Sequence, residues 1–313
     1  MNGVVITGAT GEIGIALVQL MVKECVEVLA ICRPASQRLK YLPKSDYVKV
    51  IECDLGDLHS LGLDEKKYDV FYHFGWCASY GLERDNPYIQ NDNIKYTLDA
   101  VELASKLGCR LFVGAGTQAE YGYQNVPLTP QLPTFPQTMY GVAKLSAGYF
   151  SRFLCVQKGL THVWVRIASV YGPCDGPYTL ITYIMEQLVH HQDILLTPCE
   201  QMWDYLYTED AARAFYLIGK EIKENKVYCL GSGKAKPLKT YMKEVQDFAQ
   251  KKGICTKVKV GAKPYRENQI MYLCANIDAL KLDINFCPET SFRQGLEKTF
   301  QWKEKEKKYG IDK

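Results

Sequence analysis

The chain has 313 residues, with 38 lysines and arginines against 35 acidic residues. The basic residues are scattered, so the charge pattern gives little support for a nucleic-acid-binding face. Hydrophobic residues make up 47% and charged residues 23%, which excludes global disorder and suits one large or two modest domains. No apolar run approaches the roughly 18 residues of a membrane span, and the N-terminus lacks signal-peptide features. We therefore expect a cytoplasmic protein that binds neither nucleic acid nor membrane.

Twelve cysteines are spread along the chain, and no two form a C-x-x-C pair. Zinc sites and redox motifs commonly use that spacing. Several cysteines, such as Cys32 and Cys229, lie inside apolar runs, where a free thiol behaves as a small hydrophobic side chain. We interpret them as reduced structural residues and expect no metal site, the neighbouring His190 and His191 included.

Short apolar runs alternate with amphipathic segments in the first half of the chain. Predicted strands cover residues 3–8, 27–33, 48–55, 67–75, 110–116 and 161–172, and predicted helices cover residues 14–24, 93–108 and 140–159. Strands separated by helix-length segments are typical of right-handed βαβ crossovers and a parallel sheet covered on both faces. The predicted fold class is α/β, with a doubly wound parallel sheet.

Beyond residue 172 the pattern loosens into a Pro/Gly loop and shorter elements. A helix-like stretch at 206–218 and a strand-like stretch at 227–233 stand out there. We predict a cofactor domain of residues 1–172, with return segments near 204–232, and a smaller α/β substrate domain formed mainly by residues 173–313. The charged end of the chain, residues 303–313, is interpreted as a solvated tail.

A glycine-rich segment follows the first predicted strand directly. It reads Thr7-Gly8-Ala9-Thr10-Gly11-Glu12-Ile13-Gly14, with a glycine at every third position, and it opens a predicted helix. Glycine permits the tight turn and lets a pyrophosphate approach the main chain, while the helix N-terminus supplies free N–H groups. In this context of strand, turn and helix, the motif predicts a dinucleotide site in a Rossmann fold.

The end of the second predicted strand bears on the choice of dinucleotide. An acidic residue there accepts hydrogen bonds from the adenosine ribose of NAD and repels the 2′-phosphate of NADP. This chain reads Ile31-Cys32-Arg33-Pro34 instead, and a guanidinium can hold the 2′-phosphate or stack on adenine. NADP is therefore favoured as the cofactor, and NAD is the alternative.

Tyr140 and Lys144 are four residues apart on the predicted helix 140–159, so they share one face. A tyrosine hydroxyl with a pKa of about 10 is a poor base at neutral pH. A neighbouring cation stabilises its phenolate form. Because the chain has 22 tyrosines, this spacing acquires meaning only from the motifs around it.

Those motifs form an ordered series along the chain: TGATGEIG at 7–14, Asp54-Leu55, YHFGW at 72–76, Asn93, GTQAEYG at 116–122, YGVAK at 140–144, RIASVYGP at 166–173 and WDYLYTEDAARA at 203–214. Together they resemble the extended short-chain dehydrogenase/reductase superfamily, in its NAD(P)-dependent epimerase/dehydratase branch acting on nucleotide-diphosphate sugars. The resemblance covers nearly the whole chain. It implies cofactor-binding roles for Gly8, Thr10, Gly11, Glu12, Ile13, Gly14, Arg33, Asp54, Leu55, Phe74, Gly75, Tyr140 and Lys144.

The resemblance also implies the chemistry, a hydride exchange between nicotinamide and a sugar carbon, with C4 expected. Tyr140 is expected to move the hydroxyl proton, Thr117 to hydrogen-bond the sugar oxygen, and Lys144 to bind the nicotinamide ribose and lower the pKa of the tyrosine. Tyr178 and Arg266 are predicted to bind the nucleotide-diphosphate sugar. Relatives dimerise through helices equivalent to 93–108 and 140–159, so a homodimer is expected.

Departures from the family pattern narrow the reaction. Sugar 4,6-dehydratases follow the catalytic Thr with an acidic pair, whereas this chain has Gln118-Ala119, and Glu120 comes one position late and is expected to point elsewhere. Enzymes resembling GDP-fucose synthase use a Cys where this chain has Ala119. Both mechanisms are disfavoured, as is a non-catalytic regulatory protein, because Tyr140 and Lys144 are both present.

Two reactions remain open. Arg33 favours an NADPH-dependent 4-ketoreductase, and so does the Trp203-Asp204 pair, because many epimerases have Arg-Asp at that position. The alternative is an NAD-dependent nucleotide-sugar 4-epimerase.

Overall fold

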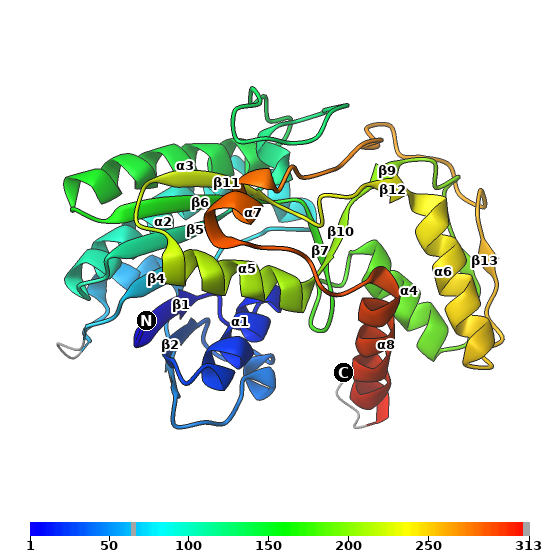
Figure 1. Cartoon of the computed structure of the whole chain (residues 1–313), viewed down its shortest axis with the longest axis horizontal. Helices are drawn as coiled ribbons and strands as arrows, with labels where there is room; N and C mark the ends of the chain where they lie inside the picture. Colours follow the sequence, from blue (N-terminus) through cyan, green and yellow to red (C-terminus); the bar gives the residue numbers. More distant parts are fainter. Residues whose placement is uncertain (64–66, 309–313) are drawn as a thin grey trace.

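The computed structural model describes residues 1–63 and 67–308. Within these residues, the centre of the fold is a seven-stranded sheet in the order β11-β6-β5-β4-β1-β2-β3 (Figure 1). Its strands are β1 (Gly3–Thr7), β2 (Glu27–Cys32), β3 (Val48–Glu52), β4 (Val70–His73), β5 (Leu111–Thr117), β6 (Thr161–Ile167) and β11 (Lys226–Leu230). Every neighbouring pair is parallel. The predicted α/β fold with a doubly wound parallel sheet is confirmed.

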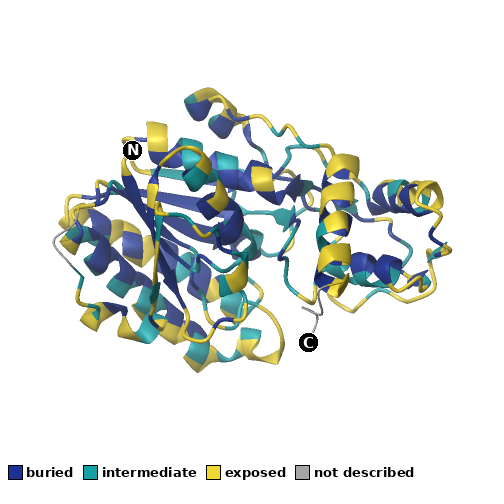
Figure 2. Cartoon of the chain, turned by 90° about the horizontal axis from the view of Figure 1, so that it is seen from below, coloured by how far each residue is buried: buried dark blue, intermediate teal, exposed yellow. Residues whose placement is uncertain are grey.

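Helices cover both faces of this sheet. The helices α2 (Pro87–Lys106) and α3 (Met139–Gln157) lie on one face, and α1 (Glu12–Lys23), α5 (Thr208–Glu221) and α7 (Asp278–Ile284) lie on the other (Figure 1). Alternation along β1 shows why both faces must be covered, since Val5 packs with α2 while Val4 and Ile6 pack with α1 and α5. Every residue of β1 and β5 is buried, and Figure 2 shows dark blue strands between the covering helices.

A second lobe lies at one end of the molecule (Figure 1). Its helices α4 (Leu180–Val189), α6 (Leu238–Lys251) and α8 (Phe292–Lys308) enclose an apolar core of their own. Three small sheets complete it and link it to the first lobe: β8 (Ile194–Leu195) with β13 (Val258–Lys259), β9 (Met202–Trp203) with β12 (Lys236–Pro237), and β7 (Ser169–Tyr171) with β10 (Tyr205–Tyr207). The domain boundary at residue 172 stays a prediction. The chain does return to the large sheet in α5, β11 and α7.

The predicted strand 161–172 is divided in two. Both neighbours of β6 end level with Ile167, at Thr117 on one side and Leu230 on the other. The Ala168 N–H still donates to the Leu230 carbonyl at 2.8 Å, and the next residues, Ser169–Tyr171, pair with β10 instead of the large sheet.

Two helix boundaries also differ from the prediction. Helix α2 begins at Pro87, because the Asn86 side chain accepts hydrogen bonds from the N–H groups of Tyr88 (3.1 Å) and Ile89 (3.4 Å) and proline suits the first helical turn. The expected charged tail is helical as far as Lys308. Residues 309–313 of that expectation lie outside the described residues. No helix in the described part of the chain is long and apolar enough to cross a bilayer.

Candidate functional site

The carboxyl ends of β1 to β5 meet at one edge of the sheet, and the strand order reverses between β1 and β4. Open α/β sheets bind ligands at such a switch point. The predicted cofactor residues collect at this edge: the glycine motif after β1, Arg33 after β2, Asp54 and Leu55 after β3, and Phe74 and Gly75 after β4.

The glycine motif leaves no room for larger side chains. Gly8 has φ +66°, and a Cβ there would lie 2.6 Å from the Gly75 nitrogen. A Cβ on Gly14 would lie 2.4 Å from the Gly8 oxygen. Gly11 precedes α1 without a side-chain cap, so the first N–H groups of the helix are not used by a capping side chain. This turn suits the pyrophosphate of a dinucleotide.

Three other motif residues are tied to the protein around them. Thr10 accepts a hydrogen bond from the Ser36 hydroxyl at 3.4 Å, and Ile13 packs against the core. The Glu12 carboxyl hydrogen-bonds that of Asp175, and burial together with this neighbour raises the pKa of Glu12 well above its usual value. These contacts hold the side chains of the turn in place.

A hydrogen bond and side-chain packing hold the end of β4 against its neighbours. The Gly75 N–H donates to Thr7 Oγ1 at 3.3 Å, and the Phe74 ring packs edge-on against Phe215 at 4.8 Å. A Cβ on Gly75 would lie 2.7 Å from the Leu55 side chain, so Leu55 lies directly over this position.

The end of β2 carries one residue that sequence reasoning missed. Arg33 is exposed there, but Glu52 of β3 lies opposite Cys32 in the sheet register, and its carboxylate accepts the Ala35 N–H at 2.7 Å. Glu52 belongs to the neighbouring strand, so only the register of the sheet shows that its carboxylate lies beside the end of β2. Arg33 and Asp54 both act on Cys77: burial and the Asp54 carboxylate raise the pKa of its thiol, and Arg33 opposes them.

Thr117 and Tyr140 are brought together by close packing between β5 and α3. The Thr138 hydroxyl caps α3 by accepting the Gly141 N–H at 3.1 Å. At Gly141 a Cβ would lie only 2.5 Å from the Ala119 oxygen. Because the helix start lies this close to the turn after β5, the Tyr140 side chain hydrogen-bonds Thr117.

Burial governs the Tyr140 hydroxyl. Burial raises its pKa above the usual value, and the Arg84 guanidinium and the hydrogen bond with Thr117 oppose that rise, while Glu120 adds to it. Arg84 carries no motif signal in the sequence, because it lies in the turn Leu82–Asp85 after β4.

Lys144 lies one helical turn beyond Tyr140 and is 4% exposed. Its ammonium donates to the Ala115 carbonyl at 2.7 Å and lies 3.8 Å from the centre of the Trp76 ring. Burial lowers the pKa of Lys144 to about 7, against the attraction of Glu120. At neutral pH this lysine is therefore only partly charged.

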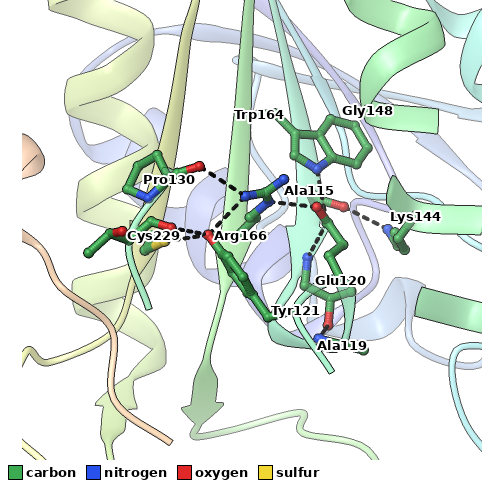
Figure 3. Close-up of polar contacts among 12 residues, drawn as sticks. Ala115, Ala119, Glu120, Tyr121, Pro130, Lys144, Gly148, Trp164, Arg166 and Cys229 are labelled. Carbon is green, nitrogen blue, oxygen red and sulfur yellow. Dashed lines mark hydrogen bonds and ion pairs between the residues drawn. The ribbon is translucent and has the colours of Figure 1, made fainter. Parts of the chain in front are cut away.

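Glu120 is fully buried, and Figure 3 shows its polar contacts. Its Oε1 accepts hydrogen bonds from the Thr117 N–H (2.9 Å) and the Trp164 indole N–H (3.0 Å), and its Oε2 accepts from Arg166 Nε at 2.7 Å. Arg166 in turn donates to the Tyr121 hydroxyl at 2.9 Å. The carboxylate points into this network, as expected, and fixes the turn that carries Thr117.

The two predicted substrate residues both come after β7 in the chain. Tyr178 is 75% exposed, and its ring centre lies 5.4 Å from that of Tyr80, which follows β4. Arg266 is exposed in the segment between β13 and α7. Their roles stay predictions. Among the described residues there is no cluster of three or more potential metal ligands.

Comparison with known proteins relates this chain to a family and to solved structures. Residues 4–231 match the profile of the NAD dependent epimerase/dehydratase family. The chain is 23% identical over 306 residues to the CDP-abequose synthase of Salmonella typhimurium, covering 94% of this chain and 96% of that protein. The UDP-glucose 4-epimerase of Thermotoga maritima, solved with UDP-glucose, has a TM-score of 0.84 and 22% identity, over 97% of this chain and 99% of that one. For the UDP-glucose 4-epimerase of Thermus thermophilus in complex with NAD, the TM-score is 0.82 and the identity 20%, with coverages of 96% and 98%. The profile covers most of the chain, and the solved structures share its fold over nearly the whole length.

Proposed function

This chain belongs to the NAD-dependent epimerase/dehydratase family of nucleotide-sugar enzymes, and we propose that it is an NADPH-dependent 4-ketoreductase acting on a nucleotide-diphosphate hexose. When bound, the nicotinamide supplies the hydride that reduces the sugar ketone. The remaining chemistry falls to Thr117, Tyr140 and Lys144.

In this proposal the Tyr140 hydroxyl gives its proton to the ketone oxygen as the carbon is reduced. The Thr117 hydroxyl hydrogen-bonds the same oxygen, which explains why it lies within hydrogen-bond distance of Tyr140. Polar groups fixed in this way stabilise the developing alkoxide. Lys144 would leave the Ala115 carbonyl to bind the nicotinamide ribose, and Tyr178 and Arg266 would contact the nucleotide sugar.

The observation that carries the choice of reductase is the exposed Arg33 at the end of β2, a strand that ends without a carboxylate. A guanidinium at this place favours the 2′-phosphate of NADPH. The similarity to CDP-abequose synthase over nearly the whole chain agrees with it.

A 4-epimerase that retains NAD is the second candidate. Glu52 favours it, because its carboxylate accepts the Ala35 N–H beside the end of β2 and would repel a 2′-phosphate. The likeness to an epimerase solved with NAD points the same way.

Mass spectrometry of the nucleotides released by denaturing freshly purified protein separates the two. Empty protein or exchangeable NADP(H) supports the reductase, and stoichiometric NAD overturns it in favour of the epimerase. Binding titrations of Arg33→Gln give an independent measurement, with NADPH affinity expected to fall at least about tenfold and NADH affinity to change little. Tyr140→Phe should bind cofactor and fail to turn over any 4-keto nucleotide sugar.

The proposal also includes assembly and location. We expect a homodimer formed through α2 and α3, because α3 carries large exposed apolar side chains along its length: Val142, Tyr149, Phe150, Phe153 and Val156. All twelve cysteines are free thiols, eight of them buried. A reducing compartment such as the cytoplasm would keep them so.

A further inference from the structure

The turn Leu82–Asp85 brings a second cation to the ring of Tyr140. The Asp85 carboxylate accepts the Met139 N–H at 2.8 Å, which docks this turn on the start of α3. The Arg84 guanidinium carbon then lies 4.5 Å from the centre of the Tyr140 ring. Arg84 Nε is buried and has no hydrogen-bond partner in the described part of the chain. A buried guanidinium nitrogen without an acceptor costs free energy, so its place beside the Tyr140 ring calls for an explanation.

Lys144, on α3, lies farther from the Tyr140 ring than Arg84 does. Its ammonium lies 5.9 Å from the centre of the tyrosine ring and 3.8 Å from that of Trp76. The Trp76 ring stands nearly perpendicular to that of Tyr140, at 6.1 Å. With a pKa of about 7 caused by burial, Lys144 is partly neutral at physiological pH, whereas a guanidinium stays charged.

We propose that Arg84 is a positioning residue of the acid–base site: its permanent positive charge, stacked on the ring of Tyr140, stabilises the phenolate that forms when the tyrosine gives up its proton. The role of Tyr140 as acid and base rests on the proposed function. The electrostatic coupling between Arg84 and Tyr140 does not, because it follows from their contact alone.

Among the charged groups around Tyr140, Arg84 does most to stabilise its phenolate form. Glu120, after β5, disfavours the phenolate, and Arg84 is the cation that lowers the pKa of Tyr140 against burial. Asp85 is engaged with the Met139 N–H. His73, on β4, adds no charge near the site, because burial lowers its pKa to about 3 and leaves the ring neutral.

Ultraviolet titration of tyrosinate in the protein as purified tests the proposal. The signal of Tyr140 is isolated by subtracting, for each variant, the same variant carrying Tyr140→Phe. In Arg84→Gln the Tyr140 midpoint should rise by about one pH unit or more, and Arg84→Lys should restore part of the shift. Arg293→Gln, at an exposed position of α8, is the matched control and should leave the midpoint unchanged.

An unchanged Tyr140 midpoint in Arg84→Gln overturns the proposal, as does an equal shift in Arg293→Gln. If Arg84→Gln does not melt cooperatively, Arg84→Met, which keeps an aliphatic contact with the ring and removes the charge, provides the same comparison. The readout needs no nucleotide sugar. A shifted midpoint in a protein that turns over no nucleotide sugar would therefore contradict the proposed function and leave the role of Arg84 standing.

Discussion

Burial sets the charge state of the side chains around Tyr140. His73 lies beneath the site with its Nδ1 2.9 Å from the Thr7 hydroxyl and its Nε2 3.3 Å from that of Thr97. Burial, and to a lesser degree the charge of Lys144, lowers the pKa of His73 to about 3. This histidine is therefore neutral and structural at physiological pH, and the proposed function leaves proton transfer to Tyr140.

Lys144 makes stability depend on pH in a direction that can be measured. Its pKa is about 7 in the folded protein against a usual 10.5. Between these values the unfolded chain binds more protons, so the free energy of unfolding rises with pH. The penalty for burying the charge is complete below the folded-state pKa and is relieved as pH approaches the unfolded-state pKa. Lys144→Met removes the penalty, so relative to wild type it should be most stabilised near pH 6, with a gap that narrows by about pH 9.

Urea denaturation of both proteins across this range measures the gap. Lys243→Met, at an exposed position of α6, is the control and should differ from wild type by the same small amount at every pH. A gap for Lys144→Met that is constant or widens with pH would contradict the assignment.

At the scale of elements, the pair Glu120 and Arg166 joins the turn after β5 to β6. Both side chains are buried, with Glu120 0% and Arg166 7% exposed, and Arg166 Nε lies 2.7 Å from Glu120 Oε2. Arg166 also lies over the Tyr121 ring, 4.7 Å from its centre. The turn that positions Thr117 is thus held by an ion pair, in which the turn contributes Glu120 and β6 contributes Arg166.

Glu120→Gln should therefore be strongly destabilising. It leaves the Arg166 charge buried without a counter-charge, at a cost of about 3–5 kcal/mol. Glu209→Gln is the matched control, because Glu209 pairs with Lys298 at 2.6 Å while both side chains are about half exposed, and its loss should stay within about 1 kcal/mol. Chemical denaturation compares the two, and losses of equal size would refute the argument.

At the scale of the whole molecule, the outer surface of α3 is a feature that burial within one chain leaves unexplained. Phe153 is 68% exposed and Phe150 56%. Rows of exposed aromatic side chains on one helix mark an interaction surface more often than single exposed residues do. The proposed homodimer covers this row with a second copy.

Phe153→Glu should convert the dimer to a monomer, since a charge at the centre of an apolar interface is not tolerated. Light scattering coupled to size-exclusion chromatography measures the mass. Leu282→Glu, at an 86% exposed position of α7, should leave the mass unchanged. A monomeric wild type, or a dimer that survives Phe153→Glu, would contradict this interface.

Local residue patterns were enough to predict the fold class and the place of the motifs. Apolar runs separated by helix-length segments predicted the parallel sheet, and the spacing of Gly8, Gly11 and Gly14 predicted a turn where added Cβ atoms have little or no space. The boundaries were less secure, because they depend on partners. Strand β6 ends at Ile167 only because both of its neighbours end there.

The sequence by itself determined the kind of fold and, through an ordered series of motifs, the family, and it predicted Thr117, Tyr140 and Lys144 as site residues, since all of these depend on residue patterns that can be read along the chain. Only the tertiary structure decided the environment of these residues. Arg84 on the Tyr140 ring and Glu52 beside the end of β2 are contacts between segments distant in the chain, created by sheet register and helix docking. Charge states followed the same rule, because the pKa of a buried lysine or histidine depends on how much water the fold removes from it.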